Sequence, residues 1–160
     1  MLIFKGENAS RIIRLGYLDT LKAFGFYWGT YFTFAKNSGR KKSLESAEAA
    51  GRIFNLDPGV LYTAEHFDEK LKEATGSYGA EVKKDLEESR SHIQLKKLSL
   101  EGLLSLVGKA NQKTITLILA DFLANSYRPG EVVSIPALPV LKEELKAAAY
   151  LTEAGITRKG

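Results

Sequence analysis

The segment Ser46–Phe67 constrains the fold most strongly, because its pattern predicts two short helices that meet in a tight turn. Helices that cross at a steep angle need small residues where their backbones approach, and the pair Ala50–Gly51 meets that need. Asn55 tolerates the left-handed backbone that a sharp turn requires. Asp57 can cap a second helix, and Pro58 suits its first position because the missing N–H would be unpaired there anyway. The sequence therefore predicts an αα-corner.

This corner, residues 43–67, resembles the helix-turn-helix superfamily of DNA-binding proteins, whose run of EAA, a small residue, an apolar residue, a turn, leucine and a capped proline it follows. The resemblance implies that the second helix presents Tyr62, Thr63 and His66 to the bases of the major groove. Arg52 is the one cation of the segment and its candidate phosphate contact. The segment also contains four acidic residues, so its net charge is −3. A purely structural corner uses the same residue types, so both interpretations stay open.

Helical periodicity recurs along the rest of the chain, and 160 residues suffice for one compact domain with a sizeable core. Gly76 and Gly79 predict a helix end, after which residues 80–98 form a separate regular helix. Thr114–Asn125 is apolar on nearly all sides, which predicts a buried central helix. The sequence thus predicts a single all-α domain over residues 1–160, a bundle of six or seven helices.

One stretch is predicted to be extended instead of helical. The proline-containing segment at residues 128–139 cannot form a central strand, because Pro136 and Pro139 lack the N–H that a sheet uses. It either pairs as an edge strand with residues 2–4 or runs over the surface of the bundle. A minor two-stranded element is therefore the one addition to the bundle that we expect.

Seven of the aromatic residues lie within positions 24–34. We expect this cluster to continue the amphipathic helix that begins near Ser10, because no hairpin turn separates the two. Rings beside a basic loop suit a single-stranded nucleic acid, whose bases stack on rings while cations hold its phosphates. Rings of this size also form a core or a protein interface. The interface residues on that second interpretation are Tyr27, Trp28, Tyr31 and Phe34.

The net charge of +4 is distributed unevenly. Residues 1–42 hold eight cations and two acids (+6), residues 43–82 three and eight (−5), and residues 83–128 eight and five (+3). An anionic partner is expected to meet the first or the third segment. The phosphate contacts predicted in the first segment are Lys36, Arg40, Lys41 and Lys42, and those of a secondary basic surface are Lys83, Lys84, Arg90, Lys96, Lys97, Lys109 and Lys113.

No catalytic or metal-binding signature occurs in the sequence. The two histidines, His66 and His92, stand apart from each other, and cysteine is absent. We therefore expect a non-enzymatic protein with no metal, no cofactor and no small-molecule substrate. The lack of cysteine and of a secretory signal predicts a cytoplasmic protein. The longest apolar stretch, Ile115–Leu123, is far shorter than the roughly 20 residues of a membrane helix, so no membrane contact is expected.

These features lead to two expectations for function. The first is a protein that binds the phosphate backbone of DNA or RNA, either as a helix-turn-helix regulator or as a subunit of a nucleoprotein complex. In size, basic balance and helical content the chain is similar to the small subunits of CRISPR effector complexes, and that resemblance implies binding without sequence preference. The second is a protein–protein adaptor, a structural subunit or a homo-oligomer that uses the aromatic cluster at residues 24–34 as its interface.

Overall fold

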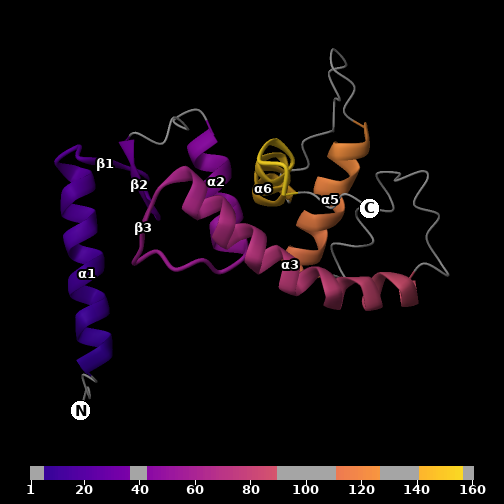
Figure 1. Cartoon of the computed structure of the whole chain (residues 1–160), viewed down its shortest axis with the longest axis horizontal. Helices are drawn as coiled ribbons and strands as arrows, with labels where there is room; N and C mark the ends of the chain where they lie inside the picture. The colour runs from indigo at the N-terminus through magenta and orange to yellow at the C-terminus, as the bar shows by residue number, and fades with distance from the viewer. Residues whose placement is uncertain (1–5, 37–42, 90–110, 127–140, 157–160) are drawn as a thin grey trace.

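A computed structural model describes residues 6–36, 43–89, 111–126 and 141–156 of the chain. The elements form an elongated arrangement, with helix α1 at one end, a small sheet beside it and the other helices beyond the sheet (Figure 1). The helices are α1 (Gly6–Ala23), α2 (Leu44–Ile53), α3 (Ala64–Ser89), α5 (Gln112–Ser126) and α6 (Lys142–Glu153), and the strands are β1 (Tyr27–Trp28), β2 (Thr33–Ala35) and β3 (Leu61–Tyr62).

The described residues form five helices and a three-stranded sheet, so the predicted all-α bundle of six or seven helices is wrong. The aromatic cluster supplies two of the strands instead of continuing α1. Gly25 has φ +74 and Gly29 has φ +114, and these left-handed conformations end the helix and turn the chain back. β1 then pairs antiparallel with β2, with Trp28 opposite Phe34.

The second helix of the predicted αα-corner does not form at residues 57–62, where a turn and a strand take its place. Asn55 has φ 57, which confirms the predicted left-handed turn. The Asp57 carboxylate accepts a hydrogen bond from the Gly59 N–H at 2.8 Å, so it closes a local turn instead of capping a helix. Leu61–Tyr62 follows as β3, which pairs parallel with β2. The predicted αα-corner is therefore wrong at the start of its second helix, because residues 61–62 pair with β2. Binding of DNA by this segment stays a prediction.

Helix α3 begins after this strand and passes through a predicted break. The Thr63 hydroxyl accepts a hydrogen bond from the His66 N–H at 3.2 Å and caps the first turn. The helix continues without interruption through Gly76 and Gly79 to Ser89, a length of 26 residues. A glycine costs a helix only about 1 kcal/mol relative to alanine, which is too little to end one of this length.

The core lies where the sheet meets α2, α3 and α6. The ring of Phe67 is at its centre, with centroids 5.0, 5.1 and 5.6 Å from those of Phe34, Tyr62 and Phe32. Gly51 of α2 faces these rings, and a Cβ there would come within 2.7 Å of Phe32 and 2.8 Å of Phe67. The small residue predicted at position 51 is thus required, although aromatic rings and not a helix backbone approach it.

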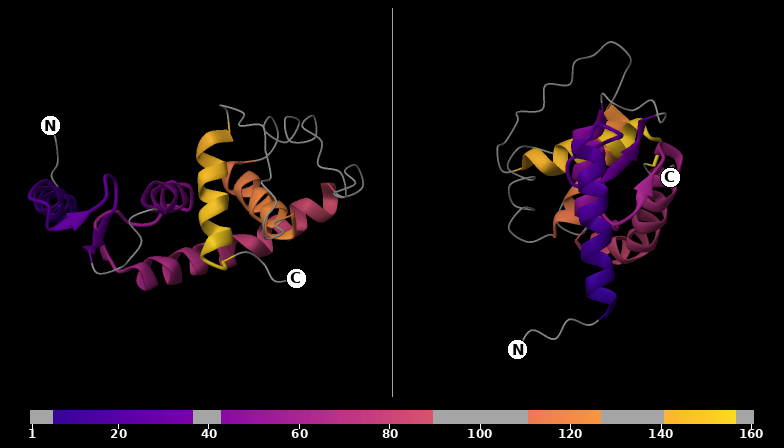
Figure 2. Two further views of the ribbon diagram at one scale, coloured as in Figure 1. Left: turned by 90° about the horizontal axis from the view of Figure 1, so that it is seen from above. Right: turned by 90° about the vertical axis from the view of Figure 1, so that its left-hand side faces the viewer.

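Helix α6 packs between α2 and α5 (Figure 2). The helix predicted at residues 114–125 is confirmed as α5, and its Ile118 and Leu119 are buried. The Tyr150 hydroxyl of α6 donates a hydrogen bond to the Asp68 carboxylate of α3 at 2.6 Å. The prediction of one domain stays a prediction, and the strand pair predicted from residues 2–4 and 128–139 lies outside the described residues.

Candidate functional site

The residues predicted to read DNA bases differ in exposure: Tyr62 is buried, His66 is half-buried and Thr63 is exposed. Tyr62 is 2% exposed, and its hydroxyl donates a hydrogen bond to the Asp57 carbonyl at 2.8 Å. Burial raises the pKa of the Tyr62 phenol and the Asp57 carboxylate raises it further, so the hydroxyl stays a protonated donor. Thr63 caps α3, and the His66 ring lies against Tyr62 with 5.4 Å between centroids. Burial thus removes Tyr62 from contact with bases, whereas Thr63 and His66 stay predicted contacts.

The predicted phosphate contacts are dispersed over the described part of the chain. Lys36 is exposed just after β2, whereas Arg52 forms an ion pair with Glu143 of α6 at 2.6 Å. The Lys113 ammonium lies over the Tyr78 ring, 5.4 Å from its centroid. The side chains of Lys83 and Lys84 on α3 are not described, and Arg40, Lys41, Lys42, Arg90, Lys96, Lys97 and Lys109 lie outside the described residues. The three described contacts thus lie on different elements: Lys36 after β2, Arg52 on α2 and Lys113 on α5.

The aromatic cluster at residues 24–34 divides into a buried part and an exposed part. Phe34, a predicted interface residue, belongs to the core, because β2 places its ring against Phe67. Tyr27 and Trp28 are half-buried on β1. The exposed rings are those of Phe24, Phe26 and the predicted interface residue Tyr31.

Helix α1 carries an exposed apolar face that the sequence analysis missed. Leu18 is its buried residue, and the helix contacts the other described elements mainly through β1 and β2. Further large apolar side chains remain in solvent along the helix and in the turn that follows it. We call this set the N-terminal apolar face, and its exposed fractions are 60% for Ile12, 72% for Ile13, 62% for Tyr17, 74% for Phe24 and 63% for Phe26.

A signal for this face was present in the sequence. Adjacent residues on a helix point about 100° apart, so Ile12 and Ile13 cannot both join the side that Leu18 buries. The heptad-like positions Ile13, Tyr17 and Phe24 lie on a second line along the helix. Apolar residues on more than one side of a helix indicate more than one packing partner.

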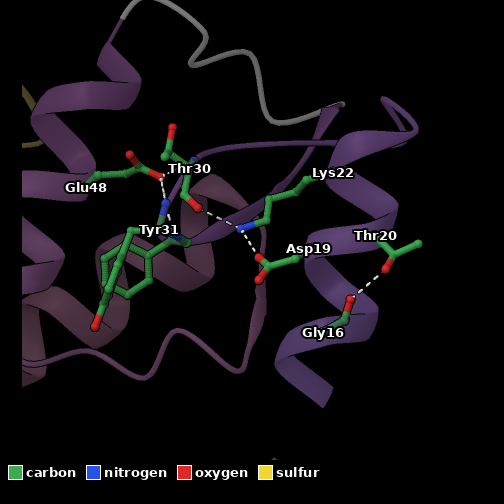
Figure 3. Close-up of polar contacts among 8 residues, drawn as sticks. Gly16, Asp19, Thr20, Lys22, Thr30, Tyr31 and Glu48 are labelled. Carbon is green, nitrogen blue, oxygen red and sulfur yellow. Dashed lines mark hydrogen bonds and ion pairs between the residues drawn. The ribbon is translucent and has the colours of Figure 1, made fainter. Parts of the chain in front are cut away.

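The turn between β1 and β2 is fixed to α2 by a carboxylate. Glu48 accepts hydrogen bonds from the N–H groups of Thr30 at 2.6 Å, Tyr31 at 2.8 Å and Phe32 at 3.2 Å (Figure 3). Gly29 permits this turn, because a Cβ at that position would collide with the Phe32 carbonyl. The sequence analysis did not single out Glu48, because one buried acid on a short helix has no sequence signature.

The same turn holds the C-terminal end of α1. The Lys22 ammonium donates a hydrogen bond to the Thr30 carbonyl at 2.9 Å and pairs with the Asp19 carboxylate at 2.8 Å (Figure 3). The N-terminal turns of α1 extend away from the sheet and from the other helices (Figure 1). The cations Arg11 and Arg14 are exposed there. The fold thus presents the N-terminal apolar face on a helix that is anchored at one end.

The remaining described surface offers less chemistry. An open hollow between the end of α2 and α3 is lined by Leu56, Val60 and His66, among others, with the Lys70–Glu73 ion pair of 2.8 Å beside it. The described residues include no group of three or more His, Asp or Glu side chains that could hold a metal ion. Within the same ranges, no helix is both long and apolar enough to span a bilayer.

Comparison with protein families, with curated proteins and with solved structures gives no match for this chain. Its function is therefore inferred from surface chemistry. Among the described residues, the N-terminal apolar face is the largest departure from an ordinary water-exposed surface.

Proposed function

We propose that this protein is a non-enzymatic adaptor or structural subunit that binds a protein partner through the N-terminal apolar face. The observation that carries the proposal is that five large apolar side chains, each at least 60% exposed, lie within one helix and the turn after it. Single exposed apolar residues are ordinary, but a group of them marks an interaction site.

The composition of the face also fits a protein interface. Aromatic residues and arginine are enriched in such interfaces. Tyr17 lies on α1 together with the exposed Arg11 and Arg14, and Phe24 follows directly after the helix. The contacts of Lys22 and Glu48 hold this region in place before a partner arrives. Less conformational entropy is then lost on binding, which favours affinity.

Binding of DNA or RNA is the second candidate function. It is supported by exposed rings and exposed arginines on one segment, because bases stack on rings while cations neutralise phosphates. Ile12 and Ile13 can do neither, and for that reason we favour a protein partner. A cytoplasmic location remains part of the proposal and is supported by the absence of cysteine.

Photo-cross-linking tests the proposal. The photoreactive residue benzoylphenylalanine replaces Tyr17 in the full-length chain, and the control replaces the exposed Lys70 of α3. We expect irradiation in cells to give a protein adduct from position 17 and none from position 70. Equal adducts from both positions, or none from position 17, would contradict the proposal. An adduct of the purified chain with single-stranded oligonucleotides that weakens steeply as salt rises would support the second candidate instead.

A further inference from the structure

We infer that the partner at the N-terminal apolar face is a second copy of this chain, and that the two α1 helices pack antiparallel around a two-fold axis beside Gly16 and Tyr17. This inference rests on the proposed function, because it identifies the occupant of the same surface. Four observations support it: the spacing of the apolar residues, the position of a glycine, the placement of charge and the available area.

The spacing of the apolar residues fits another helix. Ile13, Tyr17, Thr20 and Phe24 follow one another at steps of four, three and four residues, which places them on one line along α1. The Phe24 N–H still donates to the Thr20 carbonyl at 3.0 Å, so the helical geometry reaches the last of them. Alternating steps of three and four are the pattern with which one helix packs into another.

Gly16 is the second observation. A glycine inside a helix costs about 0.5–1 kcal/mol relative to alanine. The core rings require the glycine at position 51, whereas a Cβ at position 16 would meet nothing within 4 Å. The φ of Gly16 is not positive either, so its backbone needs no glycine. Gly16 adjoins Ile13 and Thr20 on the exposed side of α1, where a missing side chain lets another backbone approach closely.

An antiparallel arrangement makes this surface complementary to itself. With the two-fold axis between positions 16 and 17, the Gly16 backbones of the two copies approach each other beside the axis. Ile13 then lies opposite the partner's Thr20, and Phe24 lies opposite the partner's Ala9. Each of these two pairs sets a large residue against a smaller one and occurs twice by symmetry, as an isologous interface requires.

Charge favours the antiparallel direction over the parallel one. Arg14 flanks the apolar line in the first half of α1, so parallel helices in register would bring the two Arg14 side chains to the same level of the pair. The antiparallel direction brings them towards the second half of the partner helix. That half carries the negative end of the helix dipole, and its acid, Asp19, is already paired with Lys22.

The area of the face is sufficient for a small dimer. Aromatic side chains contribute about 150–250 Å² each when buried. With the exposed fractions of Tyr17, Phe24 and Phe26, these three side chains together offer roughly 300–500 Å² of accessible surface per copy for burial in a dimer. Ile13 adds to this area. A stable interface needs about 500–800 Å² per partner, so the face reaches the lower part of that range.

Sedimentation equilibrium of the full-length chain tests the inference. We expect the wild-type chain to be dimeric, and Gly16→Leu to be monomeric although it adds apolar surface. Gly16→Ala should weaken dimerisation by about tenfold, while circular dichroism shows an equal or higher melting temperature, because alanine favours the helix. Gly76→Ala is the matched control, since Gly76 is also an exposed helical glycine with nothing within 4 Å of its Cβ position. It should stabilise the chain and leave the dimer unchanged.

Tighter or unchanged dimerisation of Gly16→Ala would overturn the inference, as would a monomeric wild-type chain. If a monomeric chain still forms adducts with another protein from position 17, the inference fails and the proposed function stands. If position 17 forms no protein adduct, both fail.

Disulfide trapping tests the direction of packing, because the chain contains no cysteine. A mixture of Ala9→Cys and Phe24→Cys chains should form a mixed disulfide. These positions are 15 residues apart, about 22 Å along a helix, so parallel helices in register would not bring them together. Disulfide formation between two Phe24→Cys chains would show parallel packing and overturn the antiparallel arrangement.

Discussion

At the scale of single residues, Gly51 is a helical position where the core leaves no room for a side chain. The rings of Phe32 and Phe67 occupy the space that a side chain on α2 would take. Gly51→Ala is therefore expected to lower the free energy of unfolding by about 1–3 kcal/mol, because the rings must move. Helix propensity alone predicts that Gly51→Ala raises the free energy of unfolding, because alanine favours the helix more than glycine does. Urea denaturation followed by circular dichroism measures the difference, and Gly76→Ala should show the stabilisation that Gly51→Ala lacks. A Gly51→Ala chain as stable as wild type would contradict the packing described.

Tyr62 is the residue from which we expect a pH effect. Its folded-state pKa lies above the ordinary value of 10.0, chiefly because the phenol is buried. The folded state thus holds the phenolic proton more tightly than the unfolded state. The resulting stability is fully present below about pH 10 and is lost as the pH rises through the folded-state pKa.

Urea denaturation of wild type and Tyr62→Phe across this range checks the effect. The free energy of unfolding should fall more steeply above about pH 10 in wild type than in Tyr62→Phe. At neutral pH the variant should be less stable by about 0.5–1.5 kcal/mol, because it loses the hydrogen bond to the Asp57 carbonyl. Equal pH slopes for the two chains would show that the buried phenol has no such role.

At the scale of elements, the hairpin depends on one carboxylate from α2. Glu48→Ala should destabilise the chain by about 1.5–3 kcal/mol, since three N–H groups lose a charged acceptor. Glu48→Gln should cost less, because its amide oxygen can still accept. Trp28 is the single tryptophan of the chain and lies on β1, so its fluorescence reports on the hairpin. Unchanged Trp28 emission and stability in Glu48→Ala would show that the turn does not need this contact.

The elements also differ in how well their sequences predict them. Helix α5 was predictable because its apolar pattern is local and long. Residues 24–35 and 57–62 contain short apolar runs that fit a helix or a strand equally well. Their pairing as β1, β2 and β3 decides between the two, and β2 and β3 lie far apart in the sequence. Secondary-structure patterns within a short window cannot contain that information.

At the scale of the whole molecule, ion pairs among the described residues connect α2 to α6. Arg52 joins α2 to α6 through Glu143, and Lys146 of α6 pairs with Glu45 of α2 at 3.1 Å. Helix α1 stands at the other end of the elongated arrangement (Figure 1), and Leu18 is the residue that it buries. An interaction surface is therefore better supported at that end than at the corner of α2 and α3.

The amino-acid sequence by itself determined the local features: the left-handed turn at Asn55, the small residue at Gly51, the amphipathic helix that became α1 and the apolar helix that became α5. These depend on backbone sterics and on side-chain periodicity, which act over a few residues. The tertiary structure alone decided that Tyr62 is buried in a strand, that Glu48 binds the hairpin turn, and that Ile13 and Tyr17 remain exposed. Burial is a property of which elements meet, and that depends on contacts between residues distant in the chain.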